Sequence, residues 1–99
     1  MDRETILIID DNEEIVSALS DVLESRGYET SSAYNGRDGL RMALEDHPDL
    51  IMLDWNLPQL SGYQVLQALR ERGNKAPVVL MTIYGSENVA VQALSLIHI

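Results

Sequence analysis

The sequence predicts an α/β protein with a doubly wound parallel sheet, and two observations support this fold class. Three short apolar runs carry little polar alternation, which is typical of strands that helices cover on both faces. Segments with helical spacing separate these runs, so the expected order is βαβαβαβα. Alternating units of this length require parallel strands joined by right-handed crossover connections.

The first half of the chain predicts two strands and two helices. The run TILIID at residues 5–10 is the first strand, and YETSSAY at residues 28–34 alternates weakly, as an edge strand does. Between them we expect a helix capped by Asp11 or Asn12 and ended by Gly27. The apolar face of this helix is formed by Ile15, Leu19, Val22 and Leu23. A second helix carries Leu40, Ala43 and Leu44 and ends before Pro48.

The second half repeats this pattern. LIMLD at residues 50–54 and PVVLMT at residues 77–82 are predicted as central strands. A third helix between them should begin at Ser61 and end at Gly73, with Val65, Leu66 and Leu69 facing the core. A fourth helix is expected to start near Ser86.

Length and composition narrow the function classes. A chain of 99 residues, 45% hydrophobic, suits one small domain. The absence of cysteine excludes disulfides and thiolate metal sites, and the sequence has no run of about 18 apolar residues. We therefore expect a cytoplasmic protein that does not bind a membrane. A net charge of −9 repels phosphates, so we expect no nucleic acid binding by this chain.

Acidic side chains gather where the predicted strands end. In an open parallel sheet, ligands bind outside the carboxyl ends of the strands. Asp10 and Asp11 end the first strand, Asp54 ends the third, and Thr82 ends the fourth. Clustered carboxylates repel one another unless a cation lies among them, and oxygen ligands alone favour Mg²⁺. The alternatives are helix capping for the acid pair, a polar strand end for Asp54 and a turn residue for Thr82.

With these residues the sequence resembles the receiver domain of two-component response regulators, the CheY-like family. The matching segments are ILIIDDN, IMLDWNLPQLSG and VVLMTIYGS, in order and at the family's spacing. The resemblance predicts a receiver domain over residues 4–94 and a flavodoxin-like strand order 2-1-3-4, with the family's fifth strand and last helix missing. Pro58 and Gly62 serve only as spacing markers, because both are also ordinary loop residues.

The resemblance also implies the roles of individual residues. Asp54 would be the phosphoacceptor, Asp10, Asp11, Asp54 and the backbone carbonyl of Asn56 would hold Mg²⁺, and the Thr82 hydroxyl would bond a phosphoryl oxygen. Ile83 and Tyr84 would affect access and hydrolysis. The phosphodonor would be a sensor histidine kinase, a phosphotransfer protein or a small acyl phosphate. The domain would catalyse only its own phosphorylation and dephosphorylation, and would control a linked output domain that could bind DNA.

The end of the chain departs from the family. The family's site lysine follows the fifth strand, whereas the lysine present here, Lys75, precedes the fourth strand. We therefore expect weak phosphorylation or none. The fourth strand should also become an exposed edge. Residues 95–99 match the translation of a sequencing adapter, so we predict a non-native tail there; the alternative is a natural short helix end.

Two other functions stay open. The chain could be an interaction module that keeps the fold and works without phosphorylation. It could also be an aspartate-nucleophile phosphohydrolase, although that class usually has a second acid two residues after the nucleophile of the first strand, where Asn12 stands here.

Overall fold

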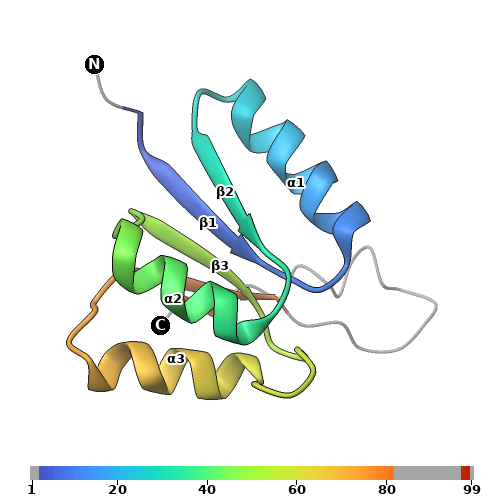
Figure 1. Cartoon of the computed structure of the whole chain (residues 1–99). Coiled ribbons are helices and arrows are strands. Elements are labelled where there is room, and N and C mark those ends of the chain that lie inside the picture. The colour runs from blue at the N-terminus through green and yellow to red at the C-terminus, as the bar shows by residue number, and fades with distance from the viewer. Residues whose placement is uncertain (1–2, 82–96, 99) are drawn as a thin grey trace.

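The structure, a computed structural model, describes residues 3–81 and 97–98 and shows one sheet with helices on both faces (Figure 1). The strand order is β2-β1-β3-β4-β5. In chain order the elements are β1 (Thr5–Ile9), α1 (Glu13–Ser25), β2 (Glu29–Ala33), α2 (Gly36–Asp46), β3 (Leu50–Asp54), α3 (Gly62–Glu71), β4 (Val78–Met81) and β5 (Ile97–His98). The predicted α/β class and the order 2-1-3-4 of the first four strands are confirmed.

Strand β5 differs from the prediction for the end of the chain. The first four strands are parallel, but Ile97 and His98 pair antiparallel with Leu80 and Val79 of β4. The alternative of a helix end is therefore wrong for Ile97 and His98, which form a strand, and β4 is paired at two residues of the edge that was expected to be exposed. The physical reason is that an apolar edge strand presents unpaired N–H and C=O groups that a neighbouring apolar segment satisfies. The predicted helix near Ser86 lies outside the described residues, and the adapter origin of the tail stays a prediction.

The sheet divides the hydrophobic core into two layers. The larger layer lies under α2 and α3 and includes the fully buried side chains Leu7, Ile9, Ile51, Leu53 and Leu69. The smaller layer joins Ile6 and Ile8 of β1 to Val16 of α1. Helix α1 thus covers one face, while α2 and α3 cover the other (Figure 1). The side on which the chain winds changes between α1 and α2, so a crevice opens between the carboxyl ends of β1 and β3.

The helix ends follow the predicted signals. Of the two candidate caps for α1, the structure assigns Asn12, whose side chain accepts hydrogen bonds from the N–H groups of Glu14 at 2.9 Å and Ile15 at 3.2 Å. Gly27 and Gly73 follow α1 and α3 with φ angles of 94° and 79°, which glycine adopts most readily. The described helices include none long and apolar enough to cross a membrane.

Helix α3 begins with a capping box, and this feature gives a stability prediction. The Ser61 hydroxyl accepts from the Gln64 N–H at 3.3 Å, and the Gln64 side chain accepts from the Ser61 N–H at 2.9 Å. Ser61→Ala should lower the free energy of unfolding by about 1 kcal/mol, measured by urea denaturation. Ser17→Ala, at an exposed position inside α1, is the control and should leave stability within about 0.5 kcal/mol. Equal losses in both variants would contradict the assigned role of the cap.

Candidate functional site

Two carboxylates are buried at the carboxyl edge of the sheet. Asp10 directly follows β1 and is 4% exposed, and Asp54 is the last residue of β3 and is 8% exposed. They are the buried charged side chains of the described residues. Ile9 and Leu53 are paired in the parallel register, so the residue after each of them lies at the same edge. The prediction that residues 44 positions apart converge there is confirmed.

Asp11 completes a cluster of three acids. Its side chain is exposed, and one carboxylate oxygen from each of Asp10, Asp11 and Asp54 lies within 4.8 Å of the others. Backbone N–H groups hold the two buried members in place. The Asn12 N–H donates to Oδ1 of Asp10 at 2.8 Å, and the Asn56 N–H donates to Oδ1 of Asp54 at 3.1 Å. The cluster is therefore built by the turns that leave β1 and β3.

Burial shifts the titration of both buried acids. Removal from water raises the pKa of Asp10 to about 6; the Asn12 hydrogen bond opposes this rise, and the negative charges of Asp54 and Asp11 add to it. Burial likewise raises the pKa of Asp54, against the Asn56 hydrogen bond and with a further rise from Asp11. Each cause except the backbone hydrogen bonds from Asn12 and Asn56 disfavours the charged form, including the side-chain interaction of Asp10 with Asp11. A cation among the three carboxylates would offset this cost.

The donor set fits Mg²⁺. The cluster offers carboxylate oxygens and contains no histidine or cysteine, and Mg²⁺ prefers oxygen ligands and binds through one or two carboxylates while keeping several waters. The exposed position of Asp11 leaves the cluster open to such a hydrated ion. Asn56 is exposed next to Asp54, and its predicted carbonyl ligand stays a prediction. Thr82, Ile83 and Tyr84 lie outside the described residues, so their predicted roles are not tested.

Gly62 contributes to the site in a way that sequence reasoning missed. It is buried at the start of α3, and its N–H donates to the Trp55 carbonyl at 3.1 Å. A Cβ atom at this position would lie 2.5 Å from the carbonyl oxygen of Asp54. A larger residue would therefore push the loop away from the end of β3. The motif LPQLSG marked the position of Gly62 but did not predict this contact. The contact depends on how the loop folds back onto the end of β3, which no local sequence pattern shows.

An aromatic pair borders the cluster. The Trp55 ring, half-buried beside Asp54, meets the exposed Tyr63 ring edge to face at a centroid distance of 5.7 Å. Lys75, in contrast, is exposed in the loop that precedes β4, at the opposite end of the strand from the residue that pairs with Asp54. The structure thus confirms that Lys75 does not belong to the acidic cluster.

Comparison with known protein families shows which family the chain belongs to. Residues 6–97 match the response regulator receiver domain. The chain belongs to this family. The resemblance predicted from the motifs is therefore confirmed, and the acidic cluster described above lies within a response regulator receiver domain.

Individual relatives are consistent with this assignment. The receiver domain is 37% identical over 89 residues to the regulatory protein AtoC of Escherichia coli, covering 90% of this chain and 19% of AtoC. It is 35% identical over 85 residues to sporulation initiation phosphotransferase F of Bacillus subtilis, and the match covers 86% of this chain and 68% of that protein. Among solved structures, the chemotaxis response regulator CheY4 of Vibrio cholerae matches with a TM-score of 0.80 and 29% identity. The match covers 86% of this chain and 72% of the CheY4 chain. The receiver domain spans only a fifth of AtoC.

The raised pKa of Asp10 predicts a pH-dependent stability without metal. Between the ordinary pKa near 4 and the folded value near 6, the folded state holds more protons than the unfolded state, so this group makes stability fall as pH rises through that window. Asp10→Asn should reduce this slope to the part due to Asp54, and should raise the free energy of unfolding at pH 7.5 by about 1–3 kcal/mol in urea titrations with EDTA. Asp46→Asn, at the exposed end of α2, is the control. If the free energy of unfolding falls with pH as steeply in Asp10→Asn as in the wild type, Asp10 is not the source of the slope.

Proposed function

We propose that this receiver domain is a phosphoacceptor of a two-component phosphorelay, in which Asp54 accepts a phosphoryl group from a histidine kinase or phosphotransfer protein and controls a linked output domain. The observation that carries this proposal is the convergence of Asp10, Asp11 and Asp54 within 4.8 Å at the carboxyl edge of the sheet. Asp54, like Asp10, is held by a backbone hydrogen bond at the end of a central strand, so it can present one oxygen in a fixed direction. The family resemblance selects Asp54 of the two as the phosphoacceptor.

The chemistry follows from these positions. An Asp54 carboxylate oxygen attacks phosphorus in line; the O–P bond forms as the P–N bond of the donor phosphohistidine breaks, and the imidazole leaves with the bonding electron pair. Asn56, through its N–H, fixes the Asp54 carboxylate during the attack, and Asn12 fixes Asp10 in the same way. Mg²⁺, when bound, supplies positive charge that offsets the carboxylates and the phosphoryl oxygens. The cluster would hold it through Asp10, Asp11 and Asp54.

Further parts of the proposal rest on the family resemblance. The Asn56 carbonyl would be another metal ligand, the Thr82 hydroxyl would bond a phosphoryl oxygen, and Ile83 and Tyr84 would tune access and hydrolysis. Hydrolysis of the aspartyl phosphate at the same site would reset the domain, which is otherwise not an enzyme. Because Lys75 lies far from the acidic cluster, we expect slow phosphorylation of this chain by itself; loss of one well-placed electrostatic donor commonly costs a factor of about 10² to 10³ in rate.

The relatives support the proposed output domain. Several are named transcriptional regulatory proteins, such as PrrA of Mycobacterium tuberculosis, of which this chain covers 38% at 36% identity. The names and the greater lengths of these relatives favour an output domain that regulates transcription. A cytoplasmic location, which the resemblance also implies, stays a prediction.

Metal binding can be measured through Trp55, the one tryptophan of the chain. Its position next to Asp54 should make its fluorescence change and saturate as Mg²⁺ is added, at constant ionic strength. Asp11→Asn and Asp54→Asn should weaken this response at least tenfold, because each removes a charged ligand. Asp46→Asn should respond as the wild type does. An unchanged response in both cluster variants would place the ion elsewhere.

Phosphorylation can be tested with acetyl phosphate, Mg²⁺ and intact mass spectrometry over long incubations. The wild type and Asp46→Asn should gain the mass of one phosphoryl group, and this gain should vanish in Asp54→Asn and in EDTA. A gain that persists in Asp54→Asn would refute the assignment of the phosphoacceptor. A version of the chain with the family's fifth strand and site lysine added is the decisive sample, because the 99-residue chain alone is expected to react slowly. Saturable Mg²⁺ binding with no mass gain in that version would instead favour the alternative, an interaction module of the same fold that works without phosphorylation.

A further inference from the structure

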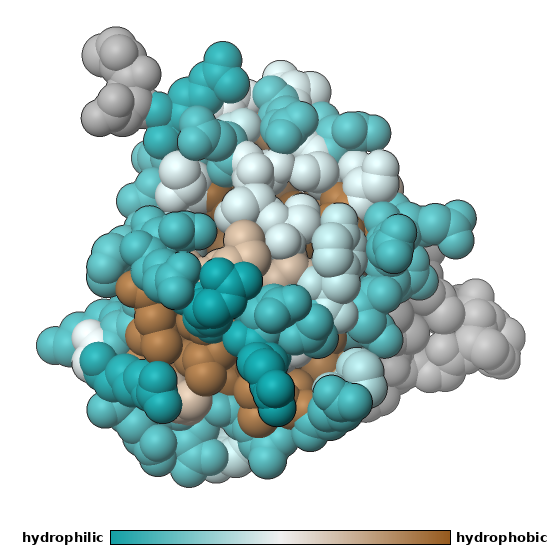
Figure 2. Space-filling view, viewed as in Figure 1, coloured by the Kyte–Doolittle hydropathy of each residue, from teal (hydrophilic) through white to brown (hydrophobic). Residues whose placement is uncertain are grey.

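The basic residues of this acidic chain gather on one side of the molecule. Five of the seven belong to α2, to α3 or to the loop after α3, namely Arg37, Arg41, Arg70, Arg72 and Lys75. Figure 2 shows a band of hydrophobic surface on the same side, bordered by hydrophilic residues, where Figure 1 places α2 and α3. The surface here therefore combines positive charge with exposed apolar groups, whereas the chain as a whole carries a charge of −9.

Two cavities form a groove along this side. One, of about 300 Å³, is lined by Arg37, Leu40, Arg41, Leu44, Glu45 and Arg72. The other, of about 460 Å³, is lined by Leu44, His47, Arg72, Lys75 and Ala76 among others. Both hollows share Leu44 and Arg72 among their lining residues, so they adjoin each other, and we call them together the α2–α3 groove.

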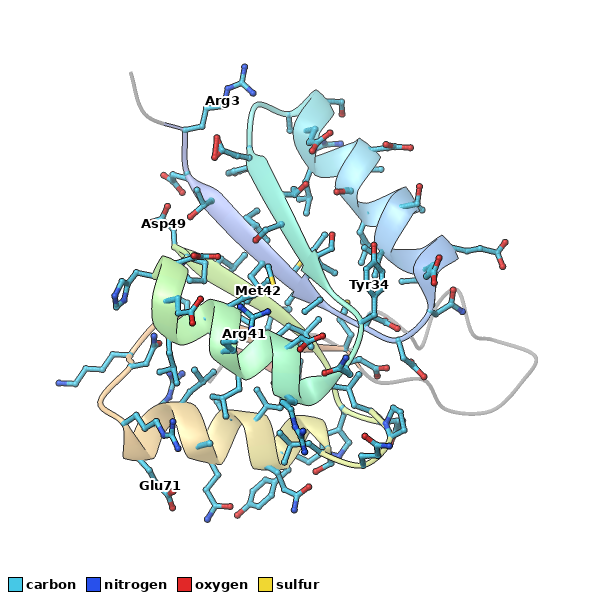
Figure 3. All side chains as sticks on the ribbon, viewed as in Figure 1. Arg3, Tyr34, Arg41, Met42, Asp49 and Glu71 are labelled. Atoms are coloured by element: carbon cyan, nitrogen blue, oxygen red, sulfur yellow. The ribbon has the colours of Figure 1, made fainter. Side chains whose placement is uncertain are left out.

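The charges of the α2–α3 groove are largely unpaired. Arg41 forms an exposed ion pair with Glu45, at 3.3 Å and four residues along α2. Within the described part of the chain, the side chains of Arg37, Arg72 and Lys75 have no ion pair or hydrogen bond. With histidine neutral, the charged residues lining the groove sum to +3. Figure 3 shows Arg41 on the outer side of α2, while Glu71 projects from α3 away from α2.

We propose that the α2–α3 groove binds an acidic peptide segment of a partner protein. The apolar side chains of such a segment would contact Leu40, Leu44 and Ala76, which are half-buried in the structure, and its carboxylates would pair with Arg37, Arg72 and Lys75. Opposite charges placed around an apolar floor direct association and select the partner. A long polyanion such as nucleic acid fits less well, because the rest of the surface is strongly acidic and repels it.

The position of the groove makes this binding compatible with an open acidic cluster. Lys75 and Ala76 precede β4, so the larger cavity lies toward the amino ends of the strands. Asp54 lies at the carboxyl ends. A segment bound near Lys75 would therefore leave the carboxylates accessible, and the proposal does not depend on whether Asp54 accepts a phosphoryl group.

The test uses the 99-residue chain and a fluorescein-labelled peptide that repeats Glu-Glu-Leu-Glu-Glu-Leu-Leu, followed by fluorescence anisotropy without Mg²⁺ or phosphodonor. The wild type should bind with an affinity that falls as salt is added. The double variant Arg72→Glu/Lys75→Glu should bind at least tenfold more weakly, and Leu44→Gln should also bind more weakly. Arg3→Glu/Arg26→Glu, which reverses two exposed charges outside the groove, is the matched control and should bind within twofold of the wild type. Thermal unfolding of each variant checks that it is folded.

Several outcomes would overturn the proposal. Absence of binding by the wild type would refute it directly. Equal losses in Arg3→Glu/Arg26→Glu and in the groove double variant would reduce the effect to net charge. Equal affinity for a peptide with Gln in place of Glu would remove the role of the cations. Tighter binding of a labelled single-stranded oligonucleotide, or self-association in sedimentation that the double variant abolishes, would assign the groove to nucleic acid or to a second copy of the chain.

Discussion

The burial of two neighbouring carboxylates is the constraint on which the rest of the site depends. Asp10 and Asp54 are held beside each other because β1 and β3 are adjacent parallel strands that end at the same edge. The hydrogen bonds from Asn12 and Asn56 favour the charged forms but do not cancel the cost of burial, so the pKa of both acids is raised. The fold thus maintains an arrangement that is unfavourable in isolation and that a bound cation would offset.

The surrounding sequence serves this arrangement. Asn12 both caps α1 and donates its N–H to Asp10, so the start of the helix and the position of the acid are set together. Gly62 lets α3 begin against the backbone of Asp54. The core under α2 and α3 keeps β1 and β3 in register. Stability and site geometry are therefore linked through the same few turns.

Much of this could be predicted from the sequence. Buried strands such as LIMLD are recognisable because they lack polar alternation, and the convergence of Asp10 with Asp54 follows from parallel topology alone. The close approach of Gly62 to Asp54 was not predictable, since it depends on how a loop folds back in space. The pairing of Ile97 with Leu80 was also missed, because two residues carry no periodicity and tertiary pairing decided their conformation. The α2–α3 groove likewise joins residues from separate helices and loops, so no local pattern marks it.

The central claim is that Asp10 and Asp54 are destabilised as anions until a metal joins them. The most direct measurement is a pH titration of the side-chain carboxyl ¹³C shifts by NMR, with and without Mg²⁺, using Asp10→Asn and Asp54→Asn for assignment. The account predicts a pKa for Asp10 near 6 and a raised pKa for Asp54 in EDTA, and a clear fall of both in Mg²⁺. Ordinary values for both acids in EDTA, unchanged by Mg²⁺, would contradict it.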